Sequence, residues 1–325
     1  MVRRSHFLRS LLALAAGGLL SSTLLAADAW PSKPIRLVVP YPPGGSSDII
    51  ARSIGQLISQ ELKQTVVIDN KPGANGNLGA EFVARAPADG YTWLLCDLGA
   101  LAISPSIYTK LSFDPSKALR GAAMLAYSPH MLVVHPSVQA SNLKELVELS
   151  KKQDLNFAVT ASGSAPHLAG VELARITGAK WVYVPYKGGV QSVQDTVAGQ
   201  TQVLMNGMLA TYPHVQSGKL KLLGISKNTR MPLIADVPTL AEQGAQGFAS
   251  GTWQGVVLPA KTPDAVIQRV NQVLLAAIRS TEVRSRLTGQ GAEVVTMTPA
   301  ETDKFFNAER ARWRAVVQAA QLQLD

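Results

Sequence analysis

Apolar residues follow two different spacings between residues 35 and 97. Short runs that are almost entirely apolar, at 35–39, 65–70 and 91–97, are typical of strands buried on both faces. Between these runs, residues 49–58 and 80–86 place their apolar side chains at helical spacing. The order strand, helix, strand, helix, strand predicts an α/β fold with a mostly parallel sheet.

The same alternation returns near residue 130. Strands are predicted at 131–135, 156–160, 181–186, 201–205 and 220–226, and helices at 142–152, 166–177 and 189–198. Further along, the pattern predicts a short strand at 256–258 and helices at 264–278, 281–288 and 299–322. We therefore expect two α/β units, with a boundary near 122–130.

A glycine-rich turn follows the first predicted strand and opens the first helix. It reads Pro-Tyr-Pro-Pro-Gly-Gly-Ser-Ser-Asp over residues 40–48. Gly44 and Gly45 allow positive φ and a close approach to a ligand, and the three residues after them are common N-cap types. Free N–H groups at a helix N-terminus favour an anion. The turn lacks the P-loop lysine and the G-x-G-x-x-G of dinucleotide sites, so the alternative to an anion site is an ordinary capped turn.

Three further turns of this kind lie at 71–79, 161–167 and 187–189, each between a strand and a helix. Open α/β sheets bind ligands outside the carboxyl ends of their strands, where all four turns are expected. Two turns fall in each unit. Units that face one another would therefore form a cleft lined by helix N-termini, and ligand pockets favour such interfaces.

The composition is that of a globular protein with dispersed positive charge. Apolar residues make up 46% of the 325 positions and charged residues 16%, which disfavours disorder. The formal net charge of +9 is not arranged as a basic stripe with aromatics, so no nucleic-acid partner is predicted. It suits a small anionic ligand. Cys96 is the only cysteine and is expected to be an inert buried thiol, and the scattered histidines predict neither a metal site nor a cofactor.

The first 29 residues have the pattern of a cleavable signal peptide. Arg3, Arg4 and Arg9 form a basic region, an apolar stretch follows over 11–25, and Ala-Asp-Ala at 27–29 fits a cleavage site. A membrane anchor is the alternative, but the apolar stretch is short for a span. We expect a soluble mature chain in the periplasm.

Several motifs occur in a specific order along the mature chain. They are PSKPI at 31–35, PYPPGGSSD at 40–48, NKPGANG at 70–76, SGS at 162–164, PHLAG at 166–170, PYKGG at 185–189 and WQG at 253–255. In this order and spacing the chain resembles the Bug family, the extracytoplasmic solute receptors of tripartite tricarboxylate transporters. The resemblance covers essentially the whole mature chain.

The resemblance implies a two-domain, type II periplasmic-binding-protein fold that closes on a ligand by hinge motion. Because the chain would cross twice, one domain is expected to comprise 30–125 and 227–325, and the other 126–226. The implied ligand is a small organic acid or amino-acid-like compound. The implied partners are the membrane permease subunits of a tripartite transporter, and the receptor is expected to be a monomer.

The turns and the resemblance together predict a ligand-binding set. It comprises Tyr41, Gly44, Gly45, Ser46, Ser47, Asp48, Gly76, Asn77, Asp97, Ser162, Ser164, His167, Tyr186, Lys187, Gly188, Gly189 and Asn206. Each has a structural alternative: the serines would cap helices, His167 would hydrogen-bond within the fold, Asp48 would pair with Arg52, Lys187 would be solvated, and the tyrosines would pack in the core.

Asp97 departs from the family pattern. The family commonly has Thr, Asn and Thr where this chain has Asp97, Leu98 and Ala100, and often Asp where it has Asn206. A carboxylate at the carboxyl end of the third strand would repel a second ligand carboxylate and favour a cationic or hydrogen-bond-donating group. We therefore expect a carboxylate compound that carries such a group.

Two other functions use the same residues. A periplasmic sensor for a signalling partner would share the binding chemistry. A hydrolase could use Ser164 with His167, but Ser-Gly-Ser-Ala-Pro at 162–166 does not match the G-x-S-x-G nucleophile elbow. A binding protein rather than an enzyme is predicted.

Overall fold

The computed structural model describes residues 30–324, and the predicted signal peptide lies outside them. Residues from Lys33 onward form one compact unit, which carries every element named below. Its strands are β1 (Ile35–Val39), β2 (Val66–Asn70), β3 (Thr92–Cys96), β4 (Leu119–Val134), β5 (Asn156–Val159), β6 (Val182–Pro185), β7 (Val203–Gly207), β8 (Lys221–Ile225), β9 (Gly251–Pro259) and β10 (Glu293–Val294).

The helices cover the sheet and alternate with its strands. They are α2 (Ser46–Leu62), α3 (Asn77–Ala84), α4 (Ser104–Ile107), α5 (Pro115–Ala118), α6 (Leu143–Ser150), α7 (Ala165–Thr177), α8 (Gly189–Val197), α9 (Met208–Gln216), α10 (Asp264–Arg279), α11 (Thr281–Gly289) and α12 (Pro299–Ala320). A π-helical turn at Gly99–Ile103 and two 3₁₀ turns, Ala74–Gly76 and Pro232–Ile234, complete the elements. Among the described residues, none of these helices combines the length and hydropathy needed to span a bilayer.

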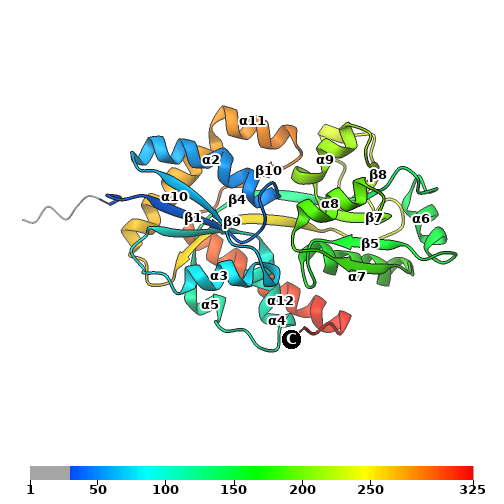
Figure 1. Cartoon of the computed structure of the whole chain (residues 1–325), viewed down its shortest axis with the longest axis horizontal. Coiled ribbons are helices and arrows are strands. Elements are labelled where there is room, and N and C mark those ends of the chain that lie inside the picture. The colour runs from blue at the N-terminus through cyan, green and yellow to red at the C-terminus, as the bar shows by residue number, and fades with distance from the viewer. Residues whose placement is uncertain (1–29, 325) are drawn as a thin grey trace, which may run out of the picture. The chain divides into compact units, whose positions relative to one another are not determined.

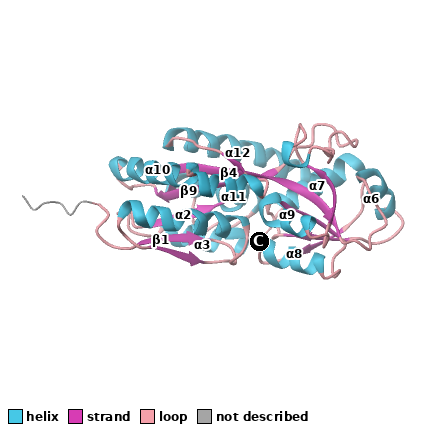
Figure 2. Ribbon diagram, turned by 90° about the horizontal axis from the view of Figure 1, so that it is seen from above, coloured by secondary structure: helices cyan, strands magenta, loops and turns pink. Residues whose placement is uncertain are grey.

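The strands form one mixed sheet in the order β2-β1-β3-β9-β4-β7-β5-β6, with β8 and β10 also paired to β4. The pairs β1–β2, β1–β3, β5–β6 and β5–β7 are parallel, as the alternating pattern predicts. The pairs that involve β4 and β9 are antiparallel. Figures 1 and 2 show β1, α2, α3 and α10 gathered at one end, which we call the first lobe. The second lobe, at the other end, contains β5–β8 and α6–α9.

Strand β4 runs from one lobe into the other. Residues 119–129 pair with β9, and residues 130–134 pair with β7. The sequence predicted a strand only from residue 131, because the preceding stretch contains Gly121, Ser128 and Pro129. The ladder with β9 shifts register after Gly121, and the missing side chain matters there, since a Cβ would lie 2.6 Å from a methyl group of Thr302 in α12. Close packing against α12 therefore explains a glycine within a buried strand.

The second lobe has a core on each face of its sheet. Met131 and Val133 of β4 pack on one face with Leu204 of β7, while Leu132 and Val134 pack on the other. This is the period-two alternation of a strand covered on both sides. Burying each such side chain contributes roughly 1.5–3 kcal/mol, so the sheet register is strongly fixed in this lobe.

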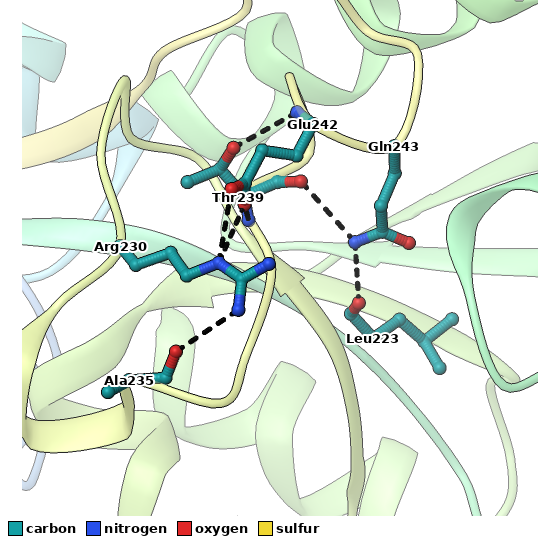
Figure 3. Close-up of polar contacts among 6 residues, drawn as sticks. All are labelled: Leu223, Arg230, Ala235, Thr239, Glu242 and Gln243. Carbon is teal, nitrogen blue, oxygen red and sulfur yellow. Dashed lines mark hydrogen bonds and ion pairs between the residues drawn. The ribbon is translucent and has the colours of Figure 1, made fainter.

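The chain returns from the second lobe through residues 226–250, which a polar cluster holds against β8 (Figure 3). Thr239 and Glu242 exchange hydrogen bonds, with Thr239 N donating to Glu242 Oε2 at 2.7 Å and Glu242 N donating to Thr239 Oγ1 at 3.0 Å. Arg230 Nε donates to both oxygens of Glu242, and Gln243 Nε2 donates to Leu223 O at 2.8 Å. The return segment is therefore anchored before it enters β9.

Candidate ligand-binding site

A cavity of about 40 Å³ lies at the carboxyl ends of strands from both lobes. Its lining comprises Tyr41, Pro42, Gly45, Ser46, Ser47, Asp97, Thr160, Ser164, Pro166, Gly189, Asn206, Ala210, Thr252 and Gln254. Tyr41 follows β1, Asp97 follows β3 and Thr160 follows β5, while Asn206 lies at the end of β7. This is the edge at which open α/β sheets bind ligands.

Two helices begin at this cavity without a side-chain cap. α2 starts at Ser46 after an extended Gly45, and Ile49 N donates to Gly45 O at 2.9 Å in its first turn. α8 starts at Gly189 in the same way, after Gly188. The N–H groups that precede the first intrahelical bond, together with the positive end of each helix dipole, favour an anion.

α7 begins at the same cavity but is capped. Ser164 Oγ accepts from His167 N and from Ala161 N, both at 3.3 Å, and His167 Nδ1 accepts from Gly163 N at 3.0 Å. The hydroxyl of Ser164 and the imidazole of His167 are thus engaged with the backbone. Burial lowers the pKa of His167. This arrangement lacks the serine–histidine hydrogen bond that activates a nucleophile.

Asp97 brings the one charged side chain to the cavity wall. Its Oδ1 accepts from Tyr41 OH at 2.7 Å and from Gly99 N at 2.7 Å. Burial raises the pKa of Asp97, and these hydrogen bonds act in the opposite direction. Burial, and then the neighbouring Asp97, raise the pKa of Tyr41 well above its ordinary value, so Tyr41 remains a donor that orients the carboxylate.

Two amide side chains in the lining have polar atoms without partners. Gln254, on β9, is fully buried, and neither its Nε2 nor its Oε1 has a hydrogen-bond partner in the described chain. Asn206 is 6% exposed and its Nδ2 is also unpartnered, while its Oδ1 accepts from Thr160 Oγ1 at 3.4 Å. Buried polar groups of this kind are rare and call for an explanation. Gln254 was missed at the sequence level, although a glutamine in the apolar run 251–259 was a usable signal.

Asp48 lies behind the first turn rather than on the cavity wall. It is 2% exposed and accepts from Gly44 N at 2.8 Å, Arg52 Nε at 2.9 Å and Asn70 Nδ2 at 3.0 Å. Burial alone would raise the pKa of Asp48, but the hydrogen bonds from Arg52, Gly44 and Asn70 lower it below its ordinary value. Asp48 thus positions the turn, in which Gly44 has φ of +87°.

The structure brings about half of the predicted residues to the cavity. Those in the lining are Tyr41, Gly45, Ser46, Ser47, Asp97, Ser164, Gly189 and Asn206. Those outside it are Gly44, Asp48, Gly76, Asn77, Ser162, His167, Tyr186, Lys187 and Gly188. Lys187 is exposed, which is the solvated arrangement given as its alternative. Pro42, Thr160, Pro166, Ala210, Thr252 and Gln254 line the cavity without having been predicted.

The lobes touch beside the cavity. Asn75 Nδ2 from the first lobe donates to Gly163 O from the second at 3.0 Å. Gly188 lies so close to Pro42 that a Cβ on it would be 2.6 Å from Pro42 Cδ. These contacts join the lobes beside the cavity, so a separation of the lobes would widen it.

Larger hollows lie elsewhere on the surface. One of about 700 Å³ is lined by residues that include Tyr108, Phe113, Arg310 and Arg314. Arg310 there donates to Leu101 O and to Asn307 Oδ1, so its guanidinium already has partners. No cluster of potential metal ligands occurs among the residues the structure describes. The central cavity combines two uncapped helices with two unpartnered buried amides in its lining.

Comparison with known proteins gives consistent matches. A family model described as tripartite tricarboxylate transporter family receptor matches residues 50–322. Protein BugT from Bordetella pertussis is 34% identical over 297 residues, which cover 90% of this chain and 91% of BugT.

Solved structures match over the same length. The periplasmic binding protein BugD has a TM-score of 0.86 at 30% identity, covering 90% of this chain and 99% of BugD. A protein from R. palustris, solved with adipate, has a TM-score of 0.87 at 30% identity, covering 90% of this chain and 99% of that protein.

Proposed function

This chain belongs to the family of tripartite tricarboxylate transporter receptors, and we propose that its central cavity captures one small carboxylate for delivery to the membrane subunits of such a transporter. The family and the matched structures are solute-binding proteins, which confirms the predictions of a periplasmic-binding-protein fold with two domains and of a binding protein rather than an enzyme. The similar proteins are periplasmic binding proteins, and we place this chain in the same compartment.

The observation that carries the proposal is the pair of uncapped helices at the cavity. α2 and α8 come from different lobes, and Ser46, Ser47 and Gly189, which stand at the starts of these helices, lie in its lining. A carboxylate bound between them would accept hydrogen bonds from both lobes at once. Each charge-assisted bond contributes roughly 1.5–3 kcal/mol, which can offset the cost of closure. The adipate bound by the R. palustris protein is such an acid.

The predicted domain division belongs to the same proposal. We assign 30–125 and 227–325 to one domain and 126–226 to the other, with the lobes moving about the strands that join them. β4 passes between the lobes near residue 130, and β9 lies beside it. Capture would then be a hinge closure that brings Pro42 against Gly188. We further propose that the receptor acts as a monomer, that its first 29 residues are removed on export, and that permease subunits receive the ligand.

Substitution of Gly45 by valine tests the proposal. Gly45 has φ of −77°, which any residue adopts, and the nearest atom to a Cβ there is Pro42 O at 3.7 Å. The variant should therefore fold, while its side chain would block the approach of a carboxylate to the start of α2. Titration calorimetry with a panel of mono-, di- and tricarboxylates should give a Kd of about micromolar for the native protein. Loss of that binding in Gly45→Val, with an unchanged unfolding midpoint, is expected; undiminished binding would contradict the proposal.

A further inference from the structure

The only formal charge in the lining of the cavity, within the described part of the chain, is negative. None of the residues that line it in the described part of the chain is Lys, Arg or His, and Asp97 supplies the one formal charge. A ligand with one carboxylate can use the N-termini of α2 and α8. A ligand with a second carboxylate would meet Asp97 with no cation to compensate for either charge.

The unpartnered amides lie in the same lining. Gln254 offers one free acceptor and one free donor, and Asn206 offers one free donor. Both side chains are more than nine-tenths buried, and each free atom needs a partner to offset its desolvation. Gln254 Oε1 can be satisfied only by a group that carries hydrogen. The Asp97 carboxylate already accepts from Tyr41 OH and Gly99 N, and its charge favours a hydrogen-bond donor over a second carboxylate.

We propose that Gln254, Asn206 and Asp97 form a recognition site for an N–H donor group on the ligand, so that the receptor selects a monocarboxylate bearing a primary amide or an ammonium over an unsubstituted dicarboxylate. This inference rests on the proposed function and specifies the ligand class of the same cavity. A primary amide would exchange two hydrogen bonds with the Gln254 carboxamide. An ammonium would donate to Gln254 Oε1 and to Asp97. In both cases the carboxylate stays at the helix N-termini.

Four acids of similar length separate these chemistries. Succinamate carries an amide, 4-aminobutyrate an ammonium, succinate a second carboxylate, and butyrate no second polar group. The native protein should bind succinamate or 4-aminobutyrate at least about tenfold more tightly than succinate and butyrate, since a site built to hydrogen-bond a group strongly disfavours analogues that lack it. Which of the two binds better identifies the amide or the ammonium as the donor.

Variants then assign the preference to residues. Gln254→Leu should reduce the affinity for the preferred compound to nearly that for butyrate. Its unfolding midpoint without ligand should be no lower than that of the native protein, because two unpartnered polar atoms are removed. Gln254→Glu should shift the preference towards 4-aminobutyrate, and Asp97→Asn should bring succinate closer to the others. Gly289→Ala, made where nothing lies within 4 Å, is the control and should change no affinity.

The outcomes distinguish this inference from the proposed function. If the native protein binds succinate as tightly as both nitrogen compounds, or if Gln254→Leu and Asp97→Asn leave the affinity ratios unchanged, the recognition site is wrong while a carboxylate receptor remains. If the native protein binds none of the four acids but binds another acid of the mono-, di- and tricarboxylate panel, the recognition site is again wrong. If it binds no acid of either set, the proposed function fails, and the inference fails with it.

Discussion

Replacing Gly188 by alanine should weaken ligand binding without destabilising the free protein. Gly188 is extended, with φ of 170° and ψ of 164°, so alanine adopts its backbone conformation without strain. The added Cβ would lie 2.6 Å from Pro42 Cδ, across the contact between the lobes. Ordinary contact begins at 3.4 Å, so the two atoms must move apart by roughly 0.8 Å. An open form of the protein would not feel this overlap, because it separates Gly188 from Pro42.

The size of the effect follows from the cost of overpacking. Extra methyl groups in a well-packed contact typically cost about 1–3 kcal/mol. If only the closed form bears this cost, the Kd rises roughly 5- to 150-fold. In a denaturation assay, ligand at about 100 times the native Kd stabilises the native protein by about 2.7 kcal/mol. A tenfold weaker variant at the same ligand concentration would gain only about 1.4 kcal/mol.

Calorimetry measures the Kd, and denaturation with and without ligand measures the stabilisation by the ligand. Gly289→Ala serves as the matched glycine-to-alanine control. Small-angle scattering should also show less compaction on ligand addition for Gly188→Ala than for the native protein. The reasoning is refuted if Gly188→Ala binds as tightly as the control. It is equally refuted if the variant loses stability in the absence of ligand, since the contact with Pro42 would then be part of the fold rather than of closure.

Two further predictions concern other parts of the chain. Asp48→Asn should destabilise the protein by about 1.5–3 kcal/mol at neutral pH, because an N–H group would replace an oxygen that faces Gly44 N and Arg52. The pKa of Asp48 is lowered in the folded protein, so its contribution to the free energy of unfolding is present above the ordinary value of 3.8 and is lost as the pH falls through the folded pKa. Urea denaturation between neutral and acidic pH should therefore show a shrinking difference in the free energy of unfolding between the native protein and Asp48→Asn. A constant difference would contradict this. Edman sequencing of the exported protein should begin near Asp28 or Trp30, whereas an intact Met1 would contradict cleavage of the signal peptide.

Local patterns predicted the parallel parts of the sheet well. The runs at 35–39 and 65–70 became β1 and β2, and the helix predicted at 264–278 became α10, because burial and periodicity act over a few residues. The strands that join the two lobes, β4 and β9, were harder to predict. β4 was predicted only from residue 131, since its first half owes its place to pairing with β9, more than a hundred residues later in the chain. Tertiary pairing overrode a sequence that contains Gly121 and Pro129.

The site shows the same division between local and long-range information. Gly45, Ser46 and Ser47 were predicted from the turn itself, and all three line the cavity. Gln254 and Thr252 were not, because they reach the cavity through β9, which carries no turn or cap motif. Lys187 was favoured by its charge and its position in a glycine turn, but the direction of its side chain depends on packing that the local sequence does not encode.

A lining without cations also bears on how tightly the receptor holds its ligand. A helix N-terminus typically contributes about 0.3–1 kcal/mol to an anion, with up to ~2 kcal/mol where it is partly buried. Together with a few charge-assisted hydrogen bonds, and after the costs of desolvation and closure, this supports binding near −8 kcal/mol, or about micromolar. A lysine or arginine would add attraction that must be overcome when the ligand is released. Helix dipoles and amides instead bind the ligand more weakly once the lobes separate, because the N-termini of α2 and α8 can then no longer contact the ligand together. A measured Kd below about 10 nM would therefore indicate that charged residues outside the described lining move onto the ligand.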